Sequence, residues 1–169
     1  MKKRSSVELK KSFDFRKVIA TICFLVATFC FAQGLKTADA VSYEISAELS
    51  IPSINLSSDV TTLTLKDHAL KTPETIVGRF SRYENKTLLI GHSTTVFNAL
   101  ENVSVGDVIN YDNEVYIVEN IEVLKRDDVN MDILLKNSEE KTIVLMTCAG
   151  ELYENGGASH RLIITATIE

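Results

Sequence analysis

The 169-residue chain carries 18 Lys and Arg against 23 Asp and Glu, a formal net charge of -5, and 45% of its residues are hydrophobic. With seven Gly and two Pro, this composition is that of a globular protein and excludes collagen-like and low-complexity chains. Residues 41–169 hold ten basic and twenty acidic residues, so this part of the chain is a poor electrostatic match for nucleic acid, and no nucleic-acid partner is expected.

The first forty residues have the layout of an export signal. Basic residues gather within 2–17, residues 18–32 are uncharged and apolar, and Ala38, Asp39 and Ala40 offer small residues for cleavage. The apolar run is short for a full membrane span, which needs roughly 20 residues. We therefore expect 1–40 to be either a cleaved signal peptide or a retained membrane anchor with its N-terminus inside. Residues 41–169 are then an extracytoplasmic domain, anchored at the cell membrane or secreted.

The exported domain is predicted to be all-β. Period-two alternation and short apolar runs, separated by polar turns, are typical of half-buried strands. The candidate strands are 45–51, 63–66, 75–80, 86–91, 108–111, 114–123, 142–146 and 161–168. Eight strands in a domain of this size predict a closed barrel, which also removes exposed sheet edges.

Two further features refine this prediction. Asp112 and Asn113 separate two strands and indicate a hairpin turn, while residues 96–100 and 131–135 are candidates for two short helices. In the last strand, alternation separates two faces, one with Leu162, Ile164, Ala166 and Ile168 and the other with Arg161, Ile163, Thr165 and Thr167.

Cysteine usage singles out one thiol. Cys23 and Cys30 lie in the apolar N-terminal run, where each is a small hydrophobic residue. Cys148 is the only cysteine of the exported domain and has no disulfide partner within it. It follows the apolar run 143–147 and precedes a polar loop, so we expect it at a strand end, on the rim of the barrel.

Two other residues are expected at strand ends. His92 follows the apolar run 87–91, and Arg161 opens the final strand. Together with Cys148 they supply a thiol nucleophile, a proton carrier and a fixed cation, the groups needed to make and break an acyl-thioester. This combination predicts an extracytoplasmic cysteine enzyme.

Other candidate residues are weaker. His160 is next to Arg161 in the expected strand, so its side chain points to the opposite face, and His68 lies in a polar loop. The histidines and the thiol lack the close spacing of a structural zinc site. Acidic residues at 112, 114, 127, 128 and 132 could bind calcium, but they lack the spacing of a regular calcium loop. We expect no required cofactor and no catalytic metal.

Several segments of the chain resemble the sortases, cysteine transpeptidases of bacterial cell surfaces. Residues Leu145-Met146-Thr147-Cys148 are similar to the family's T-L-x-T-C strand, although Val144 stands where Thr is usual. The following strand Arg161 to Ala166, Gly91-His92-Ser93 and Ile51-Pro52-Ser53-Ile54 fit too, as do Phe97 to Leu100 and Gly106 to Ile109. The resemblance runs from about residue 46 to residue 168.

This resemblance implies roles for three residues. Cys148 would attack the backbone carbonyl of a sorting signal of the Leu-Pro-x-Thr-Gly kind. His92 would protonate the leaving amine and later accept a proton from the incoming one, and Arg161 would stabilise the oxyanion or hold the substrate backbone. The implied partners are surface proteins or pilins with sorting signals, and an amine acceptor of the cell envelope. Calcium activates some members of the family.

Two alternative functions remain open from the residues. A secreted cysteine peptidase of the same fold shares the thioacyl step but transfers the acyl group to water. A non-catalytic cell-surface barrel that only binds wall polymer or a partner would need no thiol at a strand end.

Overall fold

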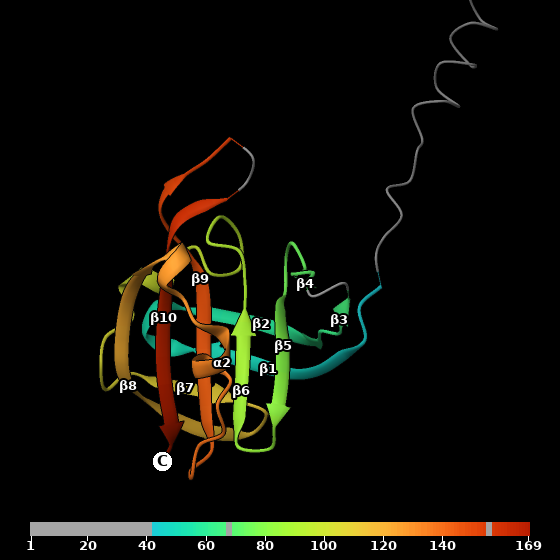
Figure 1. Cartoon of the computed structure of the whole chain (residues 1–169). Coiled ribbons are helices and arrows are strands. Elements are labelled where there is room, and N and C mark those ends of the chain that lie inside the picture. The colour runs from blue at the N-terminus through green and yellow to red at the C-terminus, as the bar shows by residue number, and fades with distance from the viewer. Residues whose placement is uncertain (1–41, 67–68, 155–156) are drawn as a thin grey trace, which may run out of the picture. The chain divides into compact units, whose positions relative to one another are not determined.

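Eight strands close into a β-barrel in the order β1-β2-β5-β6-β9-β10-β8-β7 (Figure 1). All neighbouring barrel strands are antiparallel except two parallel pairs, β2 with β5 and β6 with β9. The barrel strands are β1 (Ile45–Ile51), β2 (Leu56–Thr62), β5 (Val77–Tyr83), β6 (Lys86–Ile90), β7 (Val108–Tyr111), β8 (Glu114–Lys125), β9 (Thr142–Leu152) and β10 (Ala158–Ile168). This architecture confirms the predicted all-β barrel with few short helices.

The computed structural model describes residues 42–66, 69–154 and 157–169. The predicted signal or anchor at 1–40 lies outside these residues. Across the described ranges, no helix is long and apolar enough to cross a membrane.

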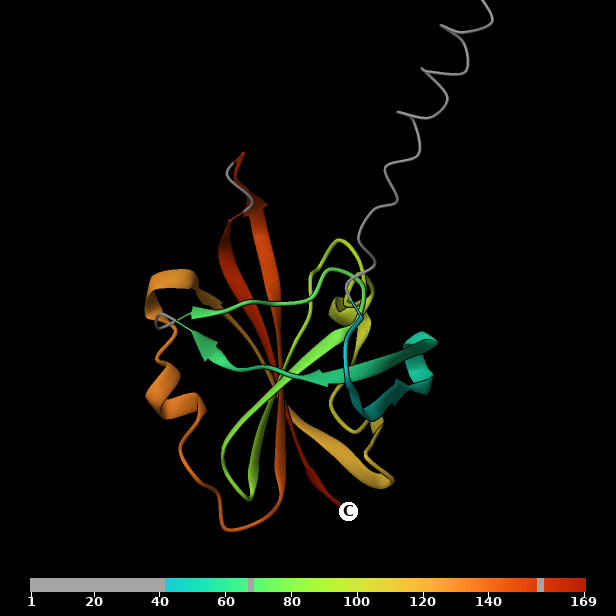
Figure 2. The same ribbon diagram turned by 90° about the vertical axis from the view of Figure 1, so that its right-hand side faces the viewer.

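A small hairpin and short helical turns lie outside the barrel. The hairpin consists of β3 (Leu65–Lys66) and β4 (Ala69–Leu70). The helical pieces are η1 (Pro52–Ile54), η2 (Leu100–Asn102), η3 (Arg126–Asp128) and α2 (Met131–Leu134). The hairpin and α2 lie on the same side of the barrel (Figure 2).

The barrel interior is one apolar core to which every barrel strand contributes. Alternate residues point inward, as the pleat of a strand requires. The connection after β6 closes the core with Phe97, Leu100 and Val103. The inward residues of β9 and β10 include Ile143, Leu145, Leu162, Ile164 and Ala166.

A second, smaller core covers the outer face of three strands. Leu88, Val144 and Ile163 from β6, β9 and β10 pack with Leu135, which follows α2. These three strands are therefore buried on both faces, which explains why they are continuous apolar runs rather than alternating ones.

Most predicted strands form, but one predicted barrel strand does not, and one barrel strand was not predicted. Strands β1 and β7 have the predicted bounds, and the faces of β10 alternate as expected. The segment 63–66 forms only the short β3 outside the barrel, and the eighth barrel strand is instead β2. The sequence of β2, Leu-Ser-Ser-Asp-Val-Thr-Thr, is mostly polar, and it becomes a strand because β1 and β5 supply hydrogen-bond partners on its two sides.

The predicted turn and helices have different outcomes. Asp112 and Asn113 both have positive φ, 52° and 64°, between the paired residues Tyr111 and Glu114, so they form the predicted two-residue hairpin turn. The predicted helix at 131–135 is confirmed as α2, which Asn130 caps by accepting hydrogen bonds from the first turn. The predicted helix at 96–100 is wrong, because this segment is a series of turns that leads into η2.

Strands β9 and β10 are longer than predicted. They continue past the barrel as a hairpin, with Ala158 paired to Leu152, and this end projects beyond the other strands (Figure 1). Strand β6 accompanies β9 only as far as the pair Ile90 and Met146. Beyond that pair, β9 has β10 on one side and, within the described ranges, no strand on the other.

Candidate functional site

Cys148 and Arg161 lie opposite each other on neighbouring strands. Cys148 is in β9, Arg161 is in β10, and the two are direct partners in the antiparallel register. The expectation that they mark strand ends is wrong, because both strands extend into the projecting hairpin. Cys148 is nevertheless at the rim of the barrel, since β9 has already lost β6 as a neighbour there.

His92 comes to the same end of the barrel from a third strand. Strand β6 runs parallel to β9, with Ile90 opposite Met146, and His92 and Cys148 each lie two residues further on. Parallel strands carry matching positions to the same edge of a sheet, so the ring of His92 and the thiol of Cys148 belong to one rim.

The alternation of β9 and β10 decides on which face the site lies. Thr147 is buried and Leu162 belongs to the interior core, so their neighbours Cys148 and Arg161 point to the outer face. On that face they continue the row that Met146 and Ile163 begin in the smaller core. The site is therefore on the outside of the barrel, above an apolar support.

Thr147 connects the strand of Cys148 to the loop of His92. Its hydroxyl donates a buried hydrogen bond to the carbonyl of Gly91, with 2.8 Å between the oxygens. The amide of Gly91 in turn donates to the carbonyl of Met146 at 3.4 Å. The residues immediately before Cys148 and His92 are thus held together, which fixes the separation of the two functional residues.

His92, Cys148 and Arg161 line one groove of about 430 Å³, here called the outer groove. Its floor consists of β6, β9 and β10, and its walls are apolar side chains from the β3–β4 hairpin and from the α2 segment. The lining residues are Leu65, Leu70, Thr72, Phe80, Arg82, Ile90, Gly91, His92, Met131, Leu135, Met146, Thr147, Cys148 and Arg161. Among these residues the charged ones are both arginines, and none carries a carboxylate.

The guanidinium of Arg161 is held by its own strand. Its Nη1 donates to the carbonyl of His160 at 2.8 Å and to that of Ala158 at 3.2 Å. An arginine has five N–H donors, so the other nitrogens can still donate to a substrate oxygen. Because these two hydrogen bonds already hold the guanidinium, the side chain loses less conformational entropy when a substrate binds.

The other two groups, the Cys148 thiol and the His92 ring, differ from Arg161 in their contacts. Within the described residues, neither the thiol of Cys148 nor the ring of His92 makes a side-chain hydrogen bond or an ion pair, and both residues are half-buried. A thiol, an imidazole and a guanidinium in one groove can carry out acyl transfer through a thioester.

The remaining histidines do not join this group. His160 does not line the outer groove, and its Nδ1 lies 2.8 Å from the hydroxyl of Ser159. This position agrees with the prediction that His160 and Arg161 point to opposite faces. His68 lies outside the described residues.

No group of three or more His, Cys, Asp or Glu side chains in the described ranges could hold a metal ion. Two of the predicted acidic candidates are already bound within the protein. Glu114 accepts from Lys141 and from the hydroxyl of Tyr116, and these hydrogen bonds lower the pKa of its carboxyl. Asp132 is paired with Arg82. That the protein requires no cofactor stays a prediction from the sequence.

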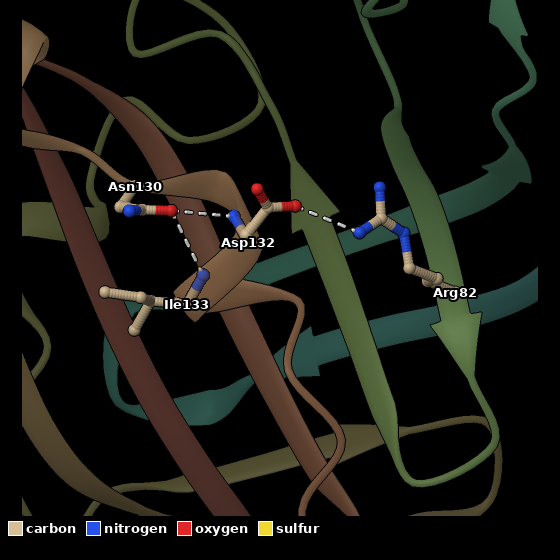
Figure 3. A network of polar contacts seen from close by, with 4 residues as sticks. All are labelled: Arg82, Asn130, Asp132 and Ile133. Carbon is tan, nitrogen blue, oxygen red and sulfur yellow. Dashed lines mark hydrogen bonds and ion pairs between the residues drawn. The ribbon is translucent and has the colours of Figure 1, made fainter.

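A polar network ties the α2 segment to the barrel beside the outer groove. Nη1 of Arg82, on β5, lies 3.1 Å from a carboxylate oxygen of Asp132 in α2 (Figure 3). The carbonyl oxygen of the Asn130 side chain accepts from the amides of Asp132 and Ile133 and so begins the helix. The pair is open to solvent, with side chains 47% and 86% exposed, so its contribution to stability is small.

The residues that form the walls of the outer groove were not predicted from the sequence. Arg82, Leu65 and Leu70 carry no local signal of a site, and they reach it only because the chain folds back on the outer face of the barrel. Thr147 was identifiable, since it immediately precedes Cys148, but its bond to Gly91 depends on the pairing of β6 with β9.

The sequence and the fold are similar to those of known proteins. A model of the sortase domain family matches residues 49–169. Sortase A from Corynebacterium diphtheriae, in a lid-mutant form, has 25% sequence identity and a TM-score of 0.59 over 78% of this chain and 74% of that chain. Sortase C-1 from Actinomyces oris has 26% identity and a TM-score of 0.58 over 81% of this chain and 78% of that one.

A more distant structure shares the fold alone. Sortase C1 from Streptococcus agalactiae is 19% identical, with a TM-score of 0.60 over 94% of this chain and 89% of that chain. No curated protein matches the chain. The family model includes His92, Cys148 and Arg161 within its bounds and covers most of the chain. The chain therefore belongs to the sortase family, the extracytoplasmic cysteine transpeptidases that act on surface proteins with sorting signals.

Proposed function

We propose that this protein is a transpeptidase that cleaves a sorting signal of the Leu-Pro-x-Thr-Gly kind and joins the acyl product to an amine of the cell envelope. One observation carries the proposal most directly: His92, Cys148 and Arg161 line a single apolar groove on the outer face of the barrel. Membership of the sortase family supports the same reaction class.

Cys148 is the nucleophile in this proposal. The thiol proton passes to His92, the sulfur attacks the carbonyl carbon of the scissile peptide bond, and the oxygen of the tetrahedral intermediate takes up negative charge. Arg161 donates to that oxygen through the nitrogens that its own strand leaves free. His92 gives a proton to the departing amine, and an acyl-thioester on Cys148 remains.

The second half of the reaction reverses these roles. An amine attacks the thioester, His92 accepts its proton, and the C–S bond breaks to release the thiol. The apolar walls of the outer groove from β3–β4 and α2 suit the aliphatic side chains of a sorting signal. The partners in this scheme are a surface protein or pilin as donor and a cell-envelope amine as acceptor.

We also propose that residues 1–40 bring the domain to the outer side of the membrane. Their basic start and apolar middle support either a cleaved signal or a retained anchor. Mass measurement of the protein isolated from membranes distinguishes the two, because cleavage removes the basic leader.

The test of the reaction is intact-mass spectrometry of the full chain in detergent. The chain is incubated with Leu-Pro-x-Thr-Gly peptides, with and without triglycine as amine. We expect an acyl adduct on Cys148 that resolves onto triglycine, and no adduct on Cys148→Ala.

Each other outcome identifies a different function. An adduct that resolves only to the free acid indicates a hydrolase. If Cys148 is alkylated by iodoacetamide but no peptide acylates it, the sorting-signal substrate is wrong and a binding barrel is favoured. If the Cys148→Ala variant still forms the acyl adduct, Cys148 is not the nucleophile.

A further inference from the structure

A second hollow opens beside Cys148. This hollow, here called the rim pocket, has a volume of about 230 Å³ and lies between the loop after β6 and the start of the projecting hairpin. The residues that matter here are Ser93, Thr94, Asn98 and Glu101 from the loop, and Thr147 and Cys148 from β9.

Cys148 and Thr147 line both the rim pocket and the outer groove. The reason lies in the barrel: β6 ends at Ile90, so no strand that the structure describes pairs with that side of β9 at Cys148. The two hollows therefore flank the sulfur of Cys148. A molecule bound in one hollow leaves the sulfur accessible from the other.

The charges of the two hollows are opposite. Among the described residues that line the outer groove are Arg82, Arg161 and His92, and none of the described lining residues carries a carboxylate. The only charged side chain lining the rim pocket, among the residues that the structure describes, is Glu101. An oxyanion is therefore favoured on one side of the sulfur and a cation on the other.

The polar side chains of the rim pocket are available to a ligand. In the described part of the chain, Ser93, Thr94, Asn98 and Glu101 make no side-chain hydrogen bond and no ion pair. By contrast, Thr95 in the same loop donates to the carbonyl of Glu74 and does not line this pocket.

We infer that the rim pocket binds the amine acceptor, with the carboxylate of Glu101 facing a cationic group of that acceptor. The inference rests on the proposed acyl transfer. While the thioester exists, the acyl chain of the donor fills the outer groove, so the second substrate reaches the carbonyl carbon from the other open side. Primary amines are protonated at neutral pH, and a molecule with two amino groups keeps one ammonium when the other attacks.

The step balances without another reactant. The lone pair of a neutral amine forms the new C–N bond, the C–S bond breaks, and its electron pair stays on the sulfur of Cys148. One amine proton moves through His92 to that sulfur. The products are an amide and a free thiol, and the ammonium beside Glu101 is unchanged.

Three amines of equal length test this inference on the full chain. Propylamine, 1,3-diaminopropane and 3-aminopropanoate share one attacking group and differ at the far end, which is neutral, cationic or anionic. For each amine, the concentration for half-maximal aminolysis and the rate at saturation are measured on the Cys148 thioester. An exposed charge pair changes an equilibrium constant by about two- to fivefold, so we expect that concentration to be lowest for the diamine and highest for the amino acid.

Glu101→Gln should remove the advantage of the diamine and the disadvantage of the amino acid, because it deletes the charge of the side chain and keeps its size. Glu48→Gln is the matched control: it removes the same charge from β1, on an exposed residue that lines neither hollow, and should keep the order. Asn98→Asp adds a second carboxylate to the rim pocket and should increase the preference for the diamine.

The outcomes separate this inference from the proposed function. If the thioester forms and aminolysis keeps its charge order in Glu101→Gln, the amine binds elsewhere and the inference is wrong. A thioester that only water resolves also overturns it, while leaving the thiol chemistry intact. If no thioester forms on the unaltered chain, the proposed function fails and the inference fails with it.

Discussion

The hydrogen bond from Thr147 to Gly91 predicts how firmly His92 is held. Thr147 is 3% exposed, and its hydroxyl is 2.8 Å from the Gly91 carbonyl in the chain segment that leads to His92. Thr147→Val keeps the shape and the β-branch of the side chain but removes the donor. The change therefore tests one bond with little change of packing.

The magnitude follows from burial. Leaving the buried Gly91 carbonyl without its donor should lower the free energy of unfolding by about 1–3 kcal/mol. In a domain of this size, that loss lowers Tm by roughly 4–12 °C. The loop of His92 also gains freedom relative to Cys148. Since small misplacements of a catalytic group can cost as much as about a hundredfold in rate, we expect the rate of Cys148 acylation to fall by roughly ten- to a hundredfold.

The assay combines thermal unfolding with the rate of thioester formation from a sorting-signal peptide. Thr165→Val is the matched control, because Thr165 lies in the neighbouring strand β10, is half-buried and makes no side-chain hydrogen bond in the described structure. Equal Tm values for the two variants would refute the stabilising bond. A lower Tm of Thr147→Val with an unchanged acylation rate would refute its role in positioning His92.

Three further predictions follow from single contacts. Gly91→Ala places a Cβ 2.6 Å from the buried ring of Phe97, so it should destabilise the domain by about 1–3 kcal/mol in chemical denaturation. Arg161→Lys keeps the charge but loses the forked donors, and the loss of an oxyanion donor, about 2.7–4 kcal/mol, predicts a hundred- to thousandfold slower acylation; near-normal turnover would contradict the assignment. The backbone amide of Ser104 lowers the pKa of Asp107, so this carboxylate stabilises the fold above its ordinary pKa of 3.8 and loses that effect as the pH falls through the lowered value. Unfolding of Asp107→Asn across pH 2–6 should therefore depend less on pH than unfolding of the unaltered chain, and identical pH profiles would contradict the contact.

Local chemistry determined those parts of the fold that depend on neighbouring residues alone. Strands β1 and β7 have the bounds that the apolar pattern predicts. The turn at Asp112 and Asn113 needs positive φ at both positions, which these two residue types tolerate better than most. The two faces of β10 follow from the pleat of any strand, and with them the direction of Arg161 relative to His160.

Pairing between distant segments decided the elements that the pattern did not predict. Strand β2 is largely polar, and its parallel register with β5, which sets Val60 opposite Val77, appears only when the barrel closes. The projecting hairpin is similar: the residues after Cys148 continue the strand because β10 pairs with them as far as Leu152.

The same division holds for the site. The sequence alone singled out His92, Cys148 and Arg161, because a thiol, an imidazole and a guanidinium next to apolar strands are recognisable by residue type and spacing. Their meeting in one groove, the walls from β3–β4 and α2, and the rim pocket on the other side of Cys148 were decided by the tertiary structure. The physical reason is that a strand pattern fixes which way a side chain points, whereas the ends of neighbouring strands, here the early end of β6, fix what that side chain can reach.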